Sequence, residues 1–112
     1  RAATHESNAG LATWVGFLTA ALRDRGTVSL VLPAARFDAG IAALRQAGCG
    51  SVTLLPVAPR AGQPAKRVLI RARKSGRAPA RLLAPLVLHQ VDGNFTEAAE
   101  DVLRRAAALA ME

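Results

Sequence analysis

Hydrophobic residues near the start of the chain recur at helical spacing and then switch to a continuous run. The helical spacing ends in a polar turn at Gly26, which predicts a helix of about three to four turns. Its apolar residues are Leu11, Trp14, Val15, Leu18 and Leu22. The β-branched run Thr27–Leu32, closed by Pro33, predicts a buried strand directly after this helix.

The pattern continues with a second helix, two strands and a third helix. One face of the second helix consists of Phe37, Ile41 and Leu44. Gly48 ends this helix, and Ser51–Val57 and Arg67–Arg73 are strands joined by a loop that contains proline and glycine. Leu86–Leu88 is a short extended segment, and the last helix is expected to start near Thr96, which suits an N-cap.

This order of elements predicts an α/β fold with a mixed sheet. Strands linked by a helix favour a parallel pair, whereas strands joined directly form an antiparallel hairpin. At 112 residues the chain forms one domain at most.

Charge is segregated along the sequence. Eight cations and no carboxylate lie in the stretch from Arg60 to Arg81, and no acidic residue occurs from 39 to 91. A codon bias explains why 13 of the 15 cations are arginine, but it does not explain the missing acids. The segregation indicates an anionic partner, and nucleic acid is the first to consider.

Other function classes are not expected. His5, His89 and Cys49 lack the paired spacing of metal ligands, and a single cysteine cannot form an internal disulfide, which fits a cytoplasmic protein. No apolar run approaches the roughly 20 residues that span a bilayer. The glycines around Cys49 precede a strand instead of opening a helix, so no cofactor-binding residue is assigned. Serine nucleophile signatures are absent, so no catalytic residue is assigned either.

The few aromatic residues do not favour a free-standing RNA-binding module. None lies between residues 38 and 94, whereas single-strand binders stack bases on exposed rings. Trp14, Phe17 and Phe37 are expected in the core because they lie in amphipathic segments. Phe95 alone is not assigned to the core.

Two stretches resemble the bacterial methyltransferases that modify adenine N6 in the anticodon loop of a valine tRNA, and their small-domain methyltransferase relatives. Residues 64–70 (PAKRVLI) are similar to that family's hairpin return strand. Residues 86–89 (LVLH) with 92–98 (DGNFTEA) are similar to its C-terminal signature. Phe95 stands where relatives often carry tyrosine.

The resemblance implies the C-terminal half of a Rossmann-like class I methyltransferase, with the antiparallel last strand inserted between its two predecessors. The family's S-adenosylmethionine loop and Asn-Pro-Pro-Tyr motif have no counterpart, so the chain alone is expected to be inactive and not to bind the cofactor. Arg1, His5 and Glu6 would adjoin the catalytic loop and help to position the substrate. If the first half is absent, Thr27–Leu32 becomes an edge through which the chain is expected to self-associate.

The resemblance also implies which cations bind RNA and which have a structural role. Ligands of open α/β sheets sit at the carboxyl ends of the parallel strands. The expected RNA-binding residues are therefore Arg36, Arg60, Lys66 and Arg67. Arg71 and Arg73 lie farther along the returning strand, where a structural role is expected. The implied function is methyl transfer to an adenine N6 amine in tRNA; the alternatives are a non-catalytic RNA-docking module or a fragment that self-associates.

Overall fold

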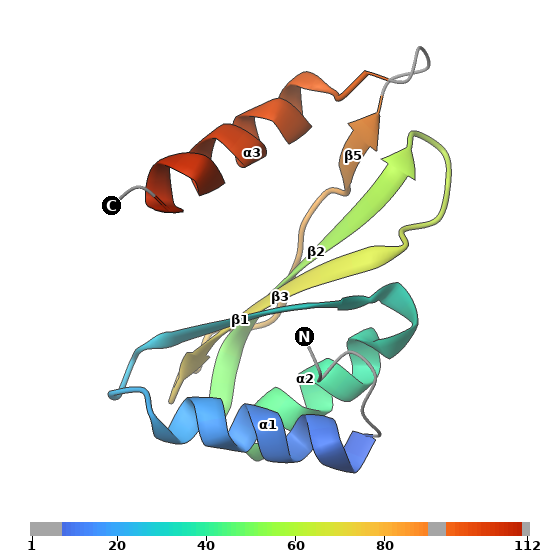
Figure 1. Cartoon of the computed structure of the whole chain (residues 1–112). Coiled ribbons are helices and arrows are strands. Elements are labelled where there is room, and N and C mark those ends of the chain that lie inside the picture. The colour runs from blue at the N-terminus through green and yellow to red at the C-terminus, as the bar shows by residue number, and fades with distance from the viewer. Residues whose placement is uncertain (1–7, 90–93, 111–112) are drawn as a thin grey trace.

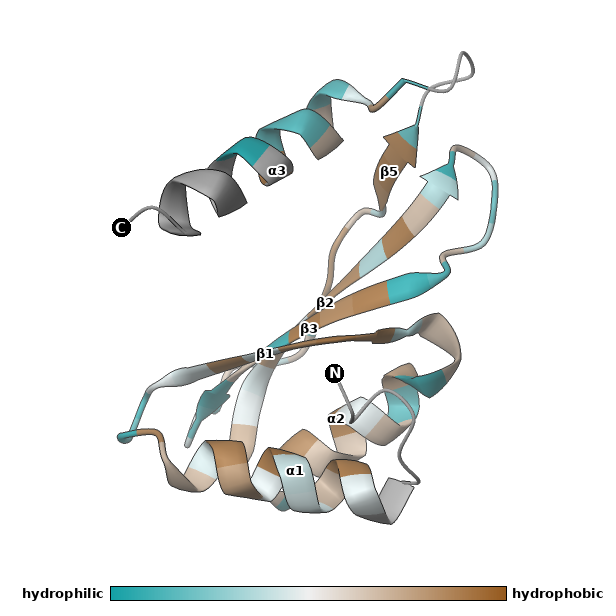
Figure 2. Ribbon diagram, in the orientation of Figure 1, coloured by the Kyte–Doolittle hydropathy of each residue, from teal (hydrophilic) through white to brown (hydrophobic). Residues whose placement is uncertain are grey.

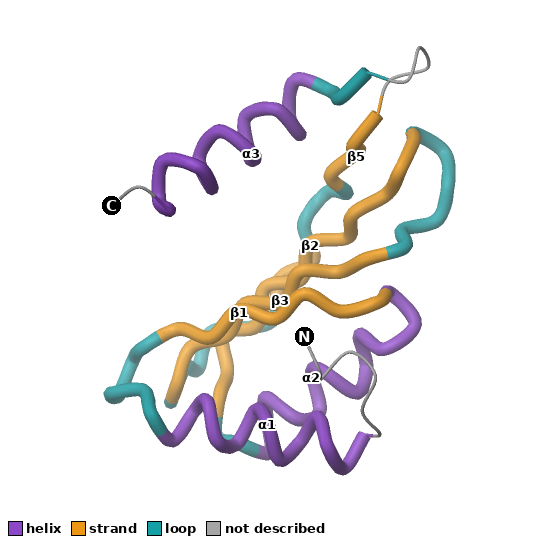
Figure 3. Tube along the Cα trace, viewed as in Figure 1, coloured by secondary structure: helices purple, strands orange, loops and turns teal. Residues whose placement is uncertain are grey.

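The computed structural model describes residues 8–89 and 94–110 and arranges them as three helices, one 3₁₀ turn and a mixed sheet (Figures 1 and 3). The elements are α1 (Asn8–Ala20), β1 (Thr27–Pro33), η2 (Ala34–Arg36), α2 (Phe37–Gln46), β2 (Cys49–Arg60), β3 (Arg67–Lys74), β4 (Arg81–Leu82), β5 (Leu86–His89) and α3 (Glu97–Ala110). Each helix and strand expected from the hydrophobic pattern is present. None of the described helices is both long and apolar enough to cross a membrane.

The sheet has the predicted insertion. β3 lies between β1 and β2 and is antiparallel to both, so β1 and β2 point in the same direction. β4 and β5 pair in parallel with the other edge of β2, first at Thr53 and Leu54 and then at Val57 to Arg60. The carboxyl ends of β1, β2 and β5 therefore point toward the same end of the sheet. The expected α/β fold with an antiparallel hairpin strand is confirmed.

The two faces of the sheet are covered differently. Leu30, Ile70 and Leu54 are cross-strand neighbours on one face, and the next row, Val31, Leu69 and Leu55, belongs to the other. α1 and α2 lie together on one side of the sheet, whereas α3 lies on the other side in Figure 1. The apolar core lies between the sheet and the α1–α2 pair.

This arrangement corrects one expectation for β1. Its side chains alternate between buried and exposed, and Val31 is 61% exposed. β1 is therefore buried on one face only, because no described helix covers its second face. In the part of the chain that the structure describes, β1 is also an edge strand, as expected.

Tight packing holds the two covering helices to the sheet. Leu11 and Val15 of α1, Leu44 of α2 and Ile70 of β3 are all 0% exposed. Burying each of these side chains contributes roughly 1.5–3 kcal/mol. A Cβ on Gly40 would lie 2.6 Å from Leu32 Cδ1, so the glycine allows α2 to approach β1 closely.

The three aromatic residues expected in the core are not in it. Trp14 is 44% exposed, Phe17 72% and Phe37 45%. Figure 2 shows hydrophobic residues distributed around α1 instead of along one stripe. At 3.6 residues per turn Phe17 lies about 200° from Val15, which already faces the sheet. The prediction was wrong because the hydrophobic pattern of an apolar helix does not show which of its sides is covered.

Candidate functional site

Backbone hydrogen bonds tie the carboxyl ends of β1 and β2 to the start of β3. Arg67 pairs with Pro33 on one side and with Val57 on the other. The Ala34 N–H donates to the Lys66 carbonyl at 2.9 Å, and the Lys66 N–H donates to the Val57 carbonyl at 3.0 Å. These bonds join the three segments at one end of the sheet, which is seen on the right-hand side of Figure 3.

The structure brings the four sequence-predicted cations to this end of the sheet. Arg36 ends η2, Arg60 ends β2, Lys66 immediately precedes β3 and Arg67 begins it. We call these four residues the basic rim. They come from three separate segments of the chain, and the pairing of β3 with β1 and β2 places these segments at the same end of the sheet.

Most of the basic rim is open to an incoming anion. The side chains of Arg60, Lys66 and Arg67 are exposed, whereas Arg36 is half-buried. The Arg67 guanidinium donates to the Lys66 carbonyl at 3.2 Å, which keeps it near the lysine. None of Arg60, Lys66 and Arg67 forms an ion pair with a described residue, so their charges are available for phosphate groups. The other predicted positions, Arg1, His5 and Glu6, lie outside the described residues.

Cations at the opposite end of the sheet have a structural role. Lys74 Nζ donates to the Leu22 carbonyl at 2.8 Å, and Arg73 Nη1 donates to the Arg25 carbonyl at 3.2 Å. Both bonds hold the turn between α1 and β1. The structural role expected for Arg73 is confirmed. These side chains lie away from the basic rim.

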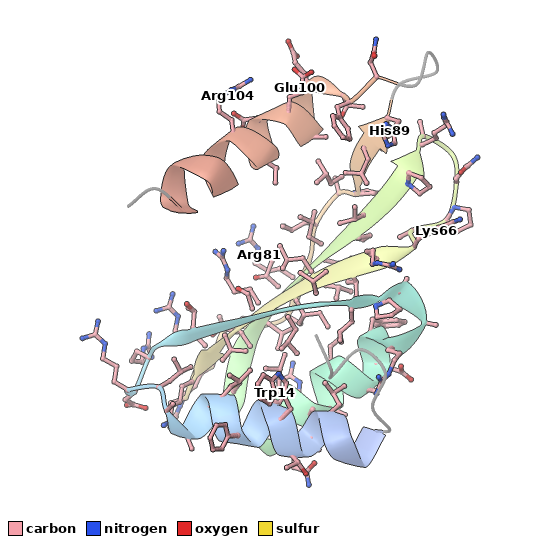
Figure 4. All side chains as sticks on the ribbon, viewed as in Figure 1. Trp14, Lys66, Arg81, His89, Glu100 and Arg104 are labelled. Carbon is pink, nitrogen blue, oxygen red and sulfur yellow. The ribbon has the colours of Figure 1, made fainter. Side chains whose placement is uncertain are left out.

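A second pair of cations lies in the middle of the sheet. Arg71 and Arg81 both pair with Thr53, one from each side of β2, so the three side chains share the face away from α1 and α2. Figure 4 shows Arg81 on that side of the sheet. Arg71 therefore belongs neither to the basic rim nor to the turn that Arg73 holds.

Sequence reasoning missed an aromatic pair beside the basic rim. The rings of His89 and Phe95 stack with centroids 4.8 Å apart and planes 21° apart. His89 pairs with Arg60 across β2 and β5, and Figure 4 shows His89 at the same end of the sheet as Lys66. The position of the stack depends on the parallel pairing of β5 with β2. A strand of four residues is too short to show a periodic pattern that would reveal this pairing.

The described residues do not form a dinucleotide-type or S-adenosylmethionine cradle. Such a cradle needs a glycine-rich turn that follows a strand and opens a helix. The strand-to-helix connection here, Pro33 to Phe37, contains no glycine and ends in a basic residue before α2. Gly48 and Gly50 lie between α2 and β2, which is the reverse order. Within the described ranges no three metal-ligating side chains gather.

Comparison with known proteins supports the fold. No protein-family model and no curated protein matches the sequence. The chain is similar to the crystal structure of a predicted O-methyltransferase, protein Atu636 from Agrobacterium tumefaciens, with a TM-score of 0.78 and 27% identity. The match covers 84% of this chain and 45% of that one, so the chain spans less than half of its length. The likeness confirms a Rossmann-like, methyltransferase-like fold, and membership of the adenine-N6 family stays a prediction.

Proposed function

We propose that these residues form the RNA-facing part of an S-adenosylmethionine-dependent methyltransferase that acts on an adenine N6 amine in tRNA. The observation that carries the proposal is the basic rim. Its four cations lie at the end of the sheet where the parallel strands have their carboxyl ends, and α/β sheets bind their ligands there. The likeness to a methyltransferase structure supports the reaction class. The choice of adenine N6 rests on the resemblance of residues 64–70 and of the C-terminal signature.

The role of the chain in this proposal is to hold the RNA. Arginine donates to phosphate in a bidentate fashion, and lysine contributes a point charge. Arg60, Lys66 and Arg67 would bind backbone phosphates and thereby set which nucleotide reaches the reaction centre. The cofactor and the catalytic loop would come from polypeptide outside these 112 residues, because the described residues do not form the cofactor cradle. We further propose that the protein is cytoplasmic, a location that fits a tRNA substrate.

The similar structure is that of a predicted O-methyltransferase, which favours a second candidate, methyl transfer to an oxygen. A basic surface suits a polyanionic substrate for either acceptor atom, so the charge pattern does not distinguish methyl transfer to nitrogen from transfer to oxygen. The chemical identity of the methylated product distinguishes the two. Transfer of a labelled methyl group to tRNA by a polypeptide that carries this chain with its cofactor-binding half, followed by nucleoside digestion, yields N6-methyladenosine under our proposal. A ribose-methylated product, or none, would contradict it.

A binding experiment tests the role of the chain itself. We expect the 112-residue chain to bind tRNA, and Lys66→Glu with Arg67→Glu to weaken that binding strongly. The matched control is Arg23→Glu with Arg77→Glu, because both residues are exposed and lie at the opposite end of the sheet. The two double variants carry the same net charge. Equal losses from both would indicate undirected attraction and would contradict a directed RNA site.

A non-catalytic docking module is a further alternative. It predicts the same RNA binding, but no methyl transfer when the cofactor-binding half is supplied. Calorimetry with S-adenosylmethionine adds a further check, since we expect no micromolar binding to the 112 residues alone. Tight binding would show that the chain holds the cofactor by itself, against the proposal.

A further inference from the structure

The face of the sheet that points away from α1 and α2 carries a row of four polar side chains. Ser29 pairs with Arg71 across β1 and β3, and Thr53 of β2 pairs with Arg71 on one side and with Arg81 on the other. Cross-strand neighbours point to the same face, so the four side chains lie side by side. Neighbouring strands are about 4.8 Å apart, which places the Cα atoms of the two arginines about 10 Å from each other. We call these four residues the arginine row.

The arginine row is open and lacks a counter-charge among the described residues. The side chains of Arg71 and Arg81 are exposed, and neither forms an ion pair with a described residue. None of the five described strands contains an acidic residue. α3 packs on β5, and Figure 4 shows Glu100 on the side of α3 that points away from the sheet. An anion on this face would therefore meet positive charge without repulsion from the strands beneath it.

The arginine row is continuous with the basic rim along β3. Arg67 and Arg71 are four residues apart on one strand, so their side chains point to the same face. The alternate positions, Val68, Ile70 and Ala72, are buried on the opposite face. The rise of a strand places the Cα atoms of Arg67 and Arg71 about 13 Å apart. A polyanion bound at the basic rim through Arg67 can thus extend over the sheet to Arg71.

The side chains of this face suit a sugar-phosphate backbone and not unpaired bases. Strands β1 to β4 contain no aromatic residue on which a base could stack. A paired RNA keeps its bases inside the helix and presents phosphates and 2′-hydroxyls. Arginine donates to phosphate in a bidentate fashion, and the hydroxyls of Ser29 and Thr53 can bond to a phosphate or a 2′-hydroxyl. The chemistry of the row therefore matches the backbone of paired RNA.

From these observations we propose that the arginine row binds the backbone of a paired RNA segment, next to the unpaired segment that the basic rim holds. The proposal rests on the function proposed above, that the basic rim binds tRNA. It assigns Arg71 a binding role in place of the structural role expected from the sequence, and it adds Arg81 to the RNA-binding residues. The bound RNA would then contact the chain on two surfaces that meet at Arg67.

The test compares two RNAs by the salt dependence of their binding. One is a hairpin with a paired stem and a seven-nucleotide loop, and the other is an unstructured oligouridine of equal length. Each phosphate contact with a duplex contributes about 0.9 to the slope of log affinity against log salt concentration. We expect Arg71→Gln with Arg81→Gln to reduce the slope for the hairpin by about 2 and to leave binding of the oligouridine unchanged. An unchanged slope for the hairpin would overturn the proposal.

The matched control is Arg23→Gln with Arg45→Gln. Both arginines are exposed, and Arg45 lies on α2, which covers the opposite face of the sheet. The two double variants lose the same charge, but the control should bind the hairpin with the slope of the unchanged chain. Equal reductions in both double variants would overturn the proposal, and so would an equal loss on the hairpin and the oligouridine.

A second measurement uses the unchanged chain. Nuclear magnetic resonance follows the arginine Nε–H signals while a blunt-ended RNA duplex is added. We expect the signals of Arg71 and Arg81 to shift and that of Arg45 to stay in place. Signals of Arg71 and Arg81 that do not move would overturn the proposal.

The failure of this proposal differs from the failure of the proposed function. If Lys66→Glu with Arg67→Glu weakens binding of both RNAs while Arg71→Gln with Arg81→Gln changes neither, the arginine row is wrong and the basic rim stands. If Arg71→Gln with Arg81→Gln lowers the sedimenting mass without changing RNA binding, the face holds a second copy of the chain, and the proposal is again wrong. If the unchanged chain binds neither RNA, both proposals fail.

Discussion

Gly50 and Gly76 lie so close together that a Cβ added to Gly50 would be 2.1 Å from the Gly76 carbonyl oxygen. Gly50 is buried in β2 beside the register shift before Thr53, and Gly76 follows the end of β3. Because the obstructing atom belongs to the backbone, a side chain at Gly50 must displace the chain itself. We expect Gly50→Ala to lower the free energy of unfolding by about 1–3 kcal/mol, measured by urea denaturation.

Gly16 provides the matched control. It lies inside α1, and a Cβ there would meet nothing within 4 Å. Alanine is a better helix former than glycine, so Gly16→Ala should raise the free energy of unfolding by roughly 0.5–1 kcal/mol. Opposite signs for the two variants are the expected result. A loss of similar size in both would mean that the contact of Gly50 with Gly76 is not what constrains the fold.

The helices and strands could be predicted because their hydrophobic spacing is regular. β1 and β3 each carry alternating apolar residues, and Gly48 with φ +92 ends α2 as glycine commonly does. The position of β3 between β1 and β2 came from the resemblance to a known family. Periodicity alone cannot order strands, because it identifies the buried face of a strand and not its neighbour.

The parts that could not be predicted depend on contacts between distant residues. Nothing local shows that Phe17 lies on an uncovered side of α1, or that His89 would stack on Phe95. β4 has only two residues, too few for any period. The basic rim could be anticipated because three of its four charges occur in the acid-free stretch and the ends of predicted strands locate them. The aromatic pair beside it had no comparable signal.

The Thr96 hydroxyl is expected to stabilise the start of α3. It accepts the Ala99 N–H at 3.1 Å, while the Glu100 N–H donates to the Thr96 backbone carbonyl at 2.9 Å. Removing the hydroxyl should therefore expose the Ala99 amide selectively. We expect Thr96→Ala to speed hydrogen exchange at Ala99 by about 2- to 30-fold, equivalent to the loss of an N-cap.

Serine at the same position is the control for this prediction. Thr96→Ser keeps the hydroxyl group and should leave exchange at Ala99 close to that of the unchanged chain. Nuclear magnetic resonance measures hydrogen exchange at the Ala99 and Glu100 amides in one experiment. Faster exchange at Ala99 in the serine variant as well would show that the methyl group, and not the hydrogen bond, holds the helix start.

The salt dependence of RNA binding should report the number of phosphate contacts made by the basic rim. Three contacts with single-stranded RNA, from Arg60, Lys66 and Arg67, predict a slope of roughly −2 in a plot of log affinity against log salt concentration. Lys66→Gln with Arg67→Gln removes two contacts and should reduce the slope to about −0.7. Fluorescence anisotropy at several salt concentrations measures both slopes. A slope unchanged by the double variant would place the contacts elsewhere on the chain.

Edge strand β1 should mediate self-association of the chain. Its outer edge has no strand partner among residues 8–89 and 94–110, and Val31, on the uncovered face, is 61% exposed. Unpaired backbone groups beside apolar side chains tend to pair with a second copy, and a charge on the edge opposes this. We expect sedimentation to show a mass that grows with concentration, and Val31→Lys to restore the monomer.

Phe17→Lys is the control for this prediction. It adds the same charge at a side chain that is 72% exposed on α1, away from the edge, and should leave association intact. If Phe17→Lys alone restores the monomer, the aromatic residues of α1 mediate the contact, and a monomer at every concentration would rule out association through β1.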